Sequence, residues 1–191
     1  MSNTRSAPLP PSYPAPPSYP QTARLLAPAT ECSFVHLART TVPVSLDALG
    51  AWNAVMAQPL PLMGLAFRLR DAISARFGVR KIGGFSTAPR HSAQAGEYLD
   101  FFLVEEITPT RLLLSERDRH LDVLTCVTAT PCPEGTEIAI TSSVKPHNTF
   151  GRLYMVPVGP AHKLIVRVML ARLRKTLLQS PPAPFTSGPN P

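Results

Sequence analysis

The sequence is short of cysteine, and this shortage excludes two classes of stabilised fold. Cys32, Cys126 and Cys132 are an odd number, and no two of them form a C-x-x-C pair. A disulfide framework and a cysteine-ligated zinc site are therefore not expected. Free thiols persist in reducing compartments, so the sequence predicts a cytoplasmic protein in which Cys126 is buried in a strand.

Long apolar runs are also missing. The best candidate, residues 54–67, is short and is interrupted by Pro59 and Pro61, whereas a membrane-spanning helix needs about 18 consecutive apolar residues. The N-terminus lacks a charged start followed by an apolar block, so it does not resemble a secretory signal. We expect no integral membrane segment.

Several motifs that hold cofactors or activate nucleophiles are absent. The chain has no G-x-G-x-x-G loop, no Walker-type Gly-Lys-Ser/Thr and no G-x-S-x-G elbow. His120, Asp122, His147 and His162 are residue types that bind zinc or iron, but no two histidines have H-x-x-x-H or H-x-H spacing. We therefore expect neither a cofactor nor a metal.

Acidic residues are missing from the C-terminal part. Residues 151–191 carry six Lys/Arg and no Asp/Glu, whereas residues 93–150 carry four and nine. A basic end can attract nucleic acid or anionic lipid, or it can pair with an acidic sheet, and we favour the pairing. Nucleic-acid readers interleave aromatic with basic residues, so no nucleic-acid partner is expected. A membrane-surface helix would need the apolar face that the core also needs.

Proline is abundant instead, with 23 residues gathered largely at the two ends. Such segments cannot bury enough apolar surface to offset the entropy lost on ordering. Residues 1–28 and 180–191 are therefore predicted to be disordered tails, and residues 29–179 a single domain. The alternative for the N-terminal tail is a Pro-x-x-Pro ligand.

The domain shows strand patterns joined by short turns. Apolar and branched residues predict strands over 31–40, 98–107, 111–116, 120–130 and 136–144. Helices are predicted after an N-cap at Ser45, over 62–77, and over 160–178, where Pro160 suits the first turn. The short connections imply an antiparallel meander. We therefore predict an α+β protein whose antiparallel sheet curls around a long C-terminal helix.

A cavity is expected where this helix covers the sheet. The predicted buried stripe of the helix consists of Leu164, Ile165, Val168 and Ala171. The predicted lining from the sheet consists of Tyr98, Phe102, Leu124 and Val144. A small apolar or amphipathic molecule is the partner that such a cavity would accept.

Three polar motifs follow one another along the domain. They read SERDRHLD at 115–122, HNTFGRLY at 147–154 and PAHKLIVR at 160–167. Because these three motifs occur in this order, the stretch 30–175 resembles an uncharacterised bacterial family, domain of unknown function 2867. The order of elements also resembles the helix-grip proteins of the START and birch-pollen-allergen type. The resemblance implies a helix-grip fold and supplies neither an activity nor catalytic residues.

Histidines beside carboxylates are the residues best suited to acid–base chemistry. Asp118, His120 and Asp122 alternate, so they would share one face of a regular strand. A carboxylate fixes the tautomer of a nearby histidine and raises its basicity. His120, Asp122 and His147 are therefore the catalytic candidates. The alternative is a solvated turn in which neighbouring arginines pair with the acids.

The ligand-binding candidates lie mostly around the start of the C-terminal helix. Arg152 suits a carboxylate, Tyr154 suits a carbonyl, and Phe102 would line the cavity. Asn148 and His162 would face a polar group of the ligand, or would only cap the helix and fix the loop. Arg152 has the alternative of an ion pair with the preceding hairpin.

Three functions remain open at this level. We favour the binding of a small apolar or amphipathic ligand between sheet and helix. The second function is a cyclase, dehydratase or isomerase that uses His120 or His147 with Asp122 in the same cavity. The third is an interaction protein with a filled core, which would recruit a partner through its Pro-rich tail or basic face. The sequence does not determine an oligomeric state.

Overall fold

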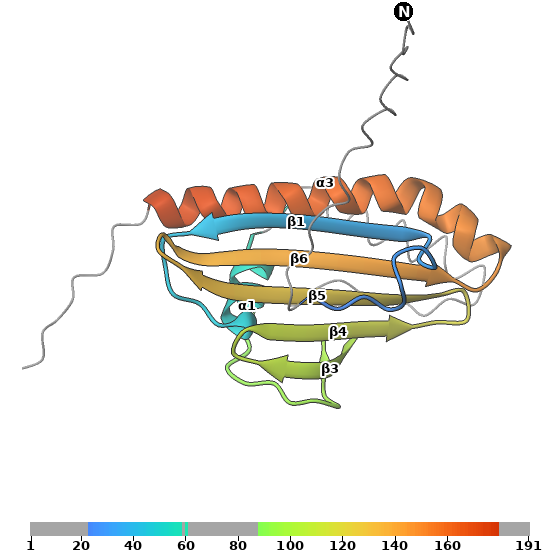
Figure 1. Cartoon of the computed structure of the whole chain (residues 1–191), viewed down its shortest axis with the longest axis horizontal. Coiled ribbons are helices and arrows are strands. Elements are labelled where there is room, and N and C mark those ends of the chain that lie inside the picture. The colour runs from blue at the N-terminus through green and yellow to red at the C-terminus, as the bar shows by residue number, and fades with distance from the viewer. Residues whose placement is uncertain (1–22, 59, 61–87, 180–191) are drawn as a thin grey trace, which may run out of the picture.

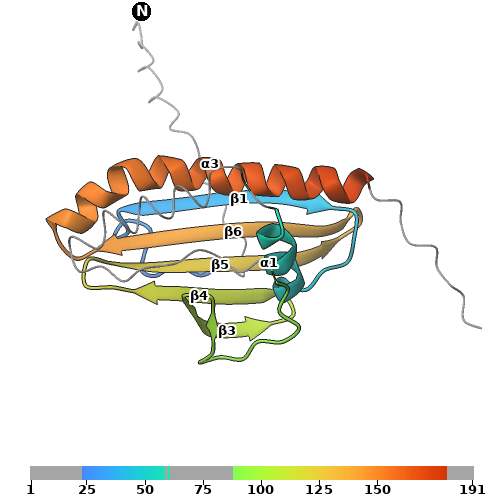
Figure 2. The same cartoon turned by 180° about the vertical axis from the view of Figure 1, so that it is seen from behind.

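A computed structural model describes residues 23–58, 60 and 88–179, and the helix predicted over 62–77 lies outside these ranges. The elements are β1 (Phe34–Val42), α1 (Ala48–Met56), β2 (Tyr98–Leu99), β3 (Phe102–Thr108), β4 (Arg111–Arg117), β5 (Leu121–Cys132), β6 (Gly135–Pro146) and α3 (Thr149–Gln179). Figure 1 shows a curved sheet with α3 along the border next to β1, and Figure 2 shows α1 against one face. The predicted α+β fold with a long C-terminal helix is confirmed.

The six strands pair antiparallel in the order β1-β6-β5-β4-β3-β2. The predicted meander from β3 to β6 is confirmed, and β1 adds to it through the distant pairing of Phe34 with Val144. The strand predicted over 98–107 is divided. Asp100 has a φ of 56°, and the two-residue turn that it forms with Phe101 folds β2 back onto β3.

One face of the sheet, here called the core face, carries the apolar core. Register places buried residues from four neighbouring strands in one row, namely Ala38, Ile140, Val127 and Leu112. Helix α1 packs on this face, where the rings of Trp52 and Phe102 meet edge to face with 6.0 Å between centroids. The cap of α1 is Asp47, whose Oδ1 accepts from the N–H of Gly50 at 2.6 Å, so the prediction of Ser45 was wrong.

The opposite face, here called the outer face, is crossed by the chain that precedes β1 (Figure 1). The N–H of Leu26 donates to Oγ of Ser143 at 2.9 Å, so contacts with the sheet begin before the predicted boundary at residue 29. Leu124 pairs with Ser143 and belongs to this outer face, so it does not line a cavity on the core face. Cys126 is buried as predicted, and burial raises the pKa of its thiol.

Helix α3 begins at Thr149, well before the predicted start at Pro160. Its first turn is capped by Asn148, whose Oδ1 accepts from the N–H of Gly151 at 2.9 Å. Pro157 and Pro160 therefore lie inside the helix, where each removes one backbone hydrogen bond. Both prolines are exposed, so water can donate hydrogen bonds to the carbonyls that lack a helical partner. Helix α3 curves in this part (Figure 1).

The buried side of α3 differs from the predicted stripe. Apart from two glycines, its buried residues are Val166, Met169, Leu170 and Leu173, which pack along β1 and the core. Leu164 is 64% exposed and Ala171 is exposed, so their prediction as core residues was wrong. The helix carries apolar side chains on two sides, and only one of them meets the sheet.

Candidate functional site

The predicted acid–base residues gather where the turn between β4 and β5 meets the start of α3. Nδ2 of Asn148 donates to Nδ1 of His120 at 2.9 Å, which places the proton of a neutral His120 ring on Nε2. The backbone N–H of His147 donates to the carbonyl of His120 at 2.8 Å. We call His120, Asp122, His147, Asn148 and Phe150 the helix-start cluster.

His147 has the carboxylate partner expected of a catalytic histidine. Its Nε2 lies 3.0 Å from Oδ1 of Asp122, and the two side chains are 40% and 20% exposed. Successive residues of a strand point to opposite faces of the sheet, and Val123 and Thr125 of β5 point to the core face. Asp122 therefore points to the outer face, and its contact with His147 lies on that side. The geometry suits proton exchange, in surroundings that water partly screens.

Tight packing at Gly151 holds the helix-start cluster together. A Cβ on this residue would lie 2.2 Å from the carbonyl oxygen of His120, so the approach requires glycine. The rings of His120 and Phe150 pack with 4.8 Å between centroids. These contacts fasten the turn to the helix, which is the structural role given above as the alternative for Asn148.

The other ligand-binding candidates lie apart from one another. Tyr154 follows Phe150 by one helical turn, with 6.2 Å between ring centroids. Arg152 is exposed, and the carboxylate of Asp122 is held by His147 instead of by Arg152. Phe102 is buried in the core beside α1. Tyr98, at the far edge of the sheet, is 52% exposed.

His162 belongs to a second group, between β1 and α3. Its ring packs edge-on against Phe34 at 5.8 Å and against His36 at 6.0 Å between centroids. His36 is only 7% exposed. Within the described part of the chain, both ring nitrogens of His36 and Nε2 of His162 lack a hydrogen-bond partner. We call His36 and His162 the buried histidine pair.

Both rings of the buried histidine pair favour the neutral form. Burial, and then the charges of Arg167 and Lys163, lower the pKa of His36 from its ordinary value of 6.5. Burial, and then His36, lower the pKa of His162 to about 4. The pair can exchange hydrogen bonds with a neutral polar group, but near neutral pH it supplies no positive charge.

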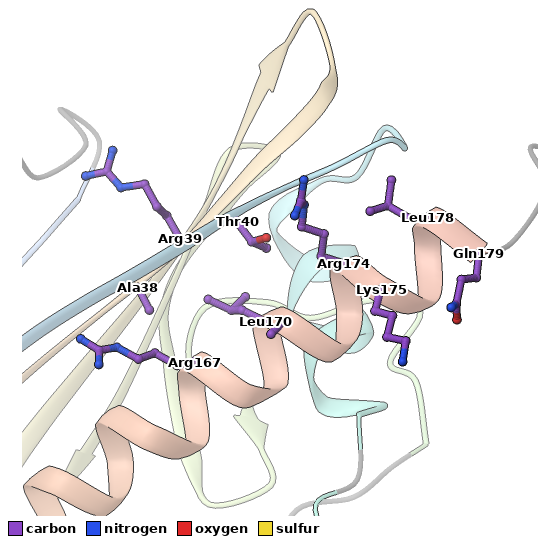
Figure 3. A pocket seen from close by; sticks show the side chains of 10 residues that line it. Ala38, Arg39, Thr40, Arg167, Leu170, Arg174, Lys175, Leu178 and Gln179 are labelled. Carbon is purple, nitrogen blue, oxygen red and sulfur yellow. The ribbon is translucent and has the colours of Figure 1, made fainter.

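An open groove of about 570 Å³ lies between β1 and the C-terminal part of α3 (Figure 3). Its lining from β1 is Ala38, Arg39 and Thr40, and its lining from α3 is Arg167, Leu170, Ala171, Arg174, Lys175, Leu178 and Gln179. The groove thus combines an apolar floor with several cations. Its volume lies in the range of about 300–1,000 Å³ that is typical of small-molecule sites.

Three cations of α3 that line the groove form no ion pair with the described part of the sheet. Arg167, Arg174 and Lys175 form no ion pair there, and the acids of the sheet pair with other partners, as Glu106 does with Arg111 and Glu105 with Arg117. The predicted attraction between the basic helix and the acidic sheet therefore does not take the form of an ion pair at these three residues. The helix dipole does not explain them either, because its effect is confined to the last turn, which contains no basic residue.

Sequence reasoning missed the groove and half of the buried histidine pair. His36 alternates inward with Phe34 and Ala38 along β1, so its inward position was visible in the strand pattern. Its meeting with His162 was not visible, because these residues lie far apart in the sequence. From the sequence, Arg167 and Arg174 are only part of a basic C-terminal helix, and it is the position of β1 that makes them one wall of a groove.

The family described as "protein of unknown function (DUF2867)" matches residues 29–169. The chain belongs to this family. The match ends inside α3, so six of the ten groove residues, from Leu170 onward, lie beyond it. The groove is therefore a feature of this chain that DUF2867 membership alone does not establish. No curated protein matches the chain.

Two solved structures are similar to this DUF2867 chain. One is a structural-genomics protein from Chromobacterium violaceum, which is 14% identical, with a TM-score of 0.37 and coverage of 76% of this chain and 99% of that one. The other is an uncharacterised protein from Rhizobium leguminosarum, which is 14% identical, with a TM-score of 0.38 and coverage of 73% and 95%.

Proposed function

We propose that this protein binds a small, mainly apolar molecule that carries an anionic group, and that the site is the groove between β1 and α3. The observation that carries the proposal is the groove itself, in which an apolar floor lies beside Arg167, Arg174 and Lys175. Ligand binding between sheet and C-terminal helix is also what the resemblance to helix-grip proteins implies. Leu124 and Tyr98, which were predicted to line the cavity, are not part of this proposal.

Each part of the lining favours one part of such a ligand. Ala38, Leu170 and Leu178 offer apolar surface, which attracts a hydrocarbon chain by about 25 cal/mol per Å² removed from water. The guanidinium groups of Arg167 and Arg174 suit a carboxylate or phosphate, because they donate paired hydrogen bonds to its oxygens. Because the groove is open, the anionic group can remain partly hydrated while the chain is covered.

Binding can be tested with dodecanoate and its uncharged analogue dodecanol, each titrated into the full chain by calorimetry. We expect dodecanoate to bind at least about tenfold more tightly than dodecanol, which is the ratio that one charge-assisted contact of about 1.4 kcal/mol provides. Arg167→Gln combined with Arg174→Gln should remove this preference. Ala171→Trp, which fills the groove without changing charge, should weaken both ligands.

The matched control is Arg90→Gln, which removes one charge from an exposed loop. The backbone atoms of Arg90, and not its side chain, bind Asn53, so the variant should fold and bind as the wild type does. Equal affinity for dodecanoate in the wild type and in the double arginine variant would refute the proposed site.

The acid–base alternative retains one supporting observation, which is the 3.0 Å approach of Nε2 of His147 to Oδ1 of Asp122. This pair lies roughly 20 Å from the groove along α3, at about 1.5 Å per residue between Arg152 and Arg167. An enzyme in the groove would therefore not use it. A separate activity at the helix-start cluster would appear as turnover of an added substrate that His147→Gln abolishes and that Ala171→Trp leaves unchanged.

A further inference from the structure

Helix α3 has an apolar side that no described strand or helix covers. Leu153, Val156 and Leu164 are 65%, 69% and 64% exposed, although large apolar residues are usually buried in a core helix. With the exposed Pro160, they follow one another at spacings of three or four residues, and the exposed Pro157 lies beside Val156. They therefore form one stripe, here called the outer stripe, on the side opposite to Val166 and Leu173.

The same side of α3 becomes basic toward its C-terminal end. Lys163, Arg167, Arg174 and Lys175 are exposed and form no ion pair within the described part of the chain. Viewed down the helix axis, where each residue turns by about 100°, these four side chains point within about 80° of the direction of the outer stripe. The helix has no acidic residue along its whole length, Thr149–Gln179. An apolar half and a basic half therefore share one face.

Nothing in the described structure lies on this face. Figures 1 and 2 show α3 along one border of the molecule, with the described strands and α1 all on its inner side. Over Leu153 to Leu178 the face extends for roughly 38 Å at about 1.5 Å per residue. Helix α3 is also long and apolar enough to be a candidate membrane span by length and composition. Its buried inner side, with Met169 and Leu173, keeps it packed on the domain instead.

We propose that the outer face of α3 attaches this protein to an anionic membrane surface. The outer stripe would enter the boundary between headgroups and acyl chains, and Lys163, Arg167, Arg174 and Lys175 would meet acidic headgroups. Nucleic acid fits less well, because exposed leucine and valine offer it no contact and this face has no aromatic platform. The outer stripe lies outside the groove, because Leu153, Val156 and Leu164 do not line it, whereas Arg167, Arg174 and Lys175 belong to both surfaces.

The attachment can be tested by sedimentation of the full chain with sucrose-loaded vesicles. One set contains phosphatidylcholine alone, and the other contains phosphatidylglycerol at about 30%. We expect the partition coefficient to be at least about tenfold higher on the anionic vesicles and to fall as salt rises from about 0.1 M to 0.5 M. Equal binding to both vesicles, or none to the anionic set, would overturn the proposal.

A triple variant tests the outer stripe directly. Leu153→Ser, Val156→Ser and Leu164→Ser together should lower the partition coefficient on anionic vesicles at least about tenfold, and circular dichroism should show an unchanged fold because the three side chains are exposed. Dodecanoate binding in the groove should persist in this variant, so failure of one proposal is distinguishable from failure of the other. Tyr98→Ser, at the far sheet edge, is the matched control for removing an exposed apolar residue and should leave vesicle binding unchanged.

A second copy of the chain is the competing occupant of the outer stripe. Sedimentation equilibrium without vesicles would then show a dimer that the triple variant dissociates. A dimer of this kind, together with vesicle binding that the triple variant leaves unchanged, would overturn the proposal.

Discussion

Lowering the pH should destabilise the domain through the buried histidine pair. The pKa of His162 falls from 6.5 to about 4 on folding, because burial and then His36 disfavour its charged form. Between these values the unfolded chain binds a proton that the folded chain does not. Stability is therefore full above pH 6.5, falls as pH decreases toward 4, and levels off below it.

The magnitude follows from the width of that window. A pH of about 5 lies about 1.5 pH units below the pKa of His162 in the unfolded chain, and each pH unit lowers the free energy of unfolding by about 1.4 kcal/mol. His162 alone should therefore lower the free energy of unfolding by about 2 kcal/mol between about pH 7.5 and pH 5. The pKa of His36 is lowered in the same direction, first by burial and then by Arg167 and Lys163, so its contribution adds to this loss.

Urea unfolding at the two pH values measures the effect in the wild type and in His162→Asn. Other groups also titrate in this range, so the decisive quantity is the difference between the two proteins. The variant should lose about 2 kcal/mol less than the wild type on acidification, even if it is less stable at both pH values. His91→Asn, at an exposed loop position, is the matched control and should behave as the wild type does. An equal pH dependence in the wild type and in His162→Asn would show that His162 titrates alike in both states, and would refute the reasoning.

Two further predictions concern the helix-start cluster. Asn148→Ala removes the acceptor for the N–H of Gly151 and the donor to His120, and should lower the free energy of unfolding by about 1–2 kcal/mol in urea titrations; Asn148→Asp, which retains the acceptor alone, should lose less. Gly151→Ala would place a Cβ 2.2 Å from the carbonyl of His120 and should cost about 2 kcal/mol or more, so an unchanged unfolding midpoint would contradict the close approach.

The strands were predictable because their signal is local. Alternating apolar residues and short turns identify β4, β5 and β6 with ends shifted by a few residues, and adjacency along the chain then implies antiparallel pairing. The break at Asp100 was not predictable. It depends on a positive φ at Asp100 and on the pairing of Tyr98 with Leu103 and of Leu99 with Phe102, whereas the composition of the segment favours one continuous strand.

The start of α3 was missed because two local signals compete. Pro160 is a strong start signal in isolation, whereas Asn148 is an equally good cap twelve positions earlier in the chain. Contacts of Asn148 and Gly151 with the turn at His120 decide in favour of the earlier start. Those contacts join residues far apart in the sequence, so the residues next to the helix start do not by themselves reveal them.

The sequence by itself determined which residues are apolar, which are charged, and where the chain turns, and these features suffice for the α+β class and the DUF2867 family. Tertiary structure alone decided which apolar side of α3 became the core and which remained exposed. It also placed His36 against His162 and set Arg167 beside β1 to form the groove. The physical reason is that burial and proximity depend on neighbours from distant parts of the chain, whereas hydrophobicity, charge and backbone preference belong to each residue locally.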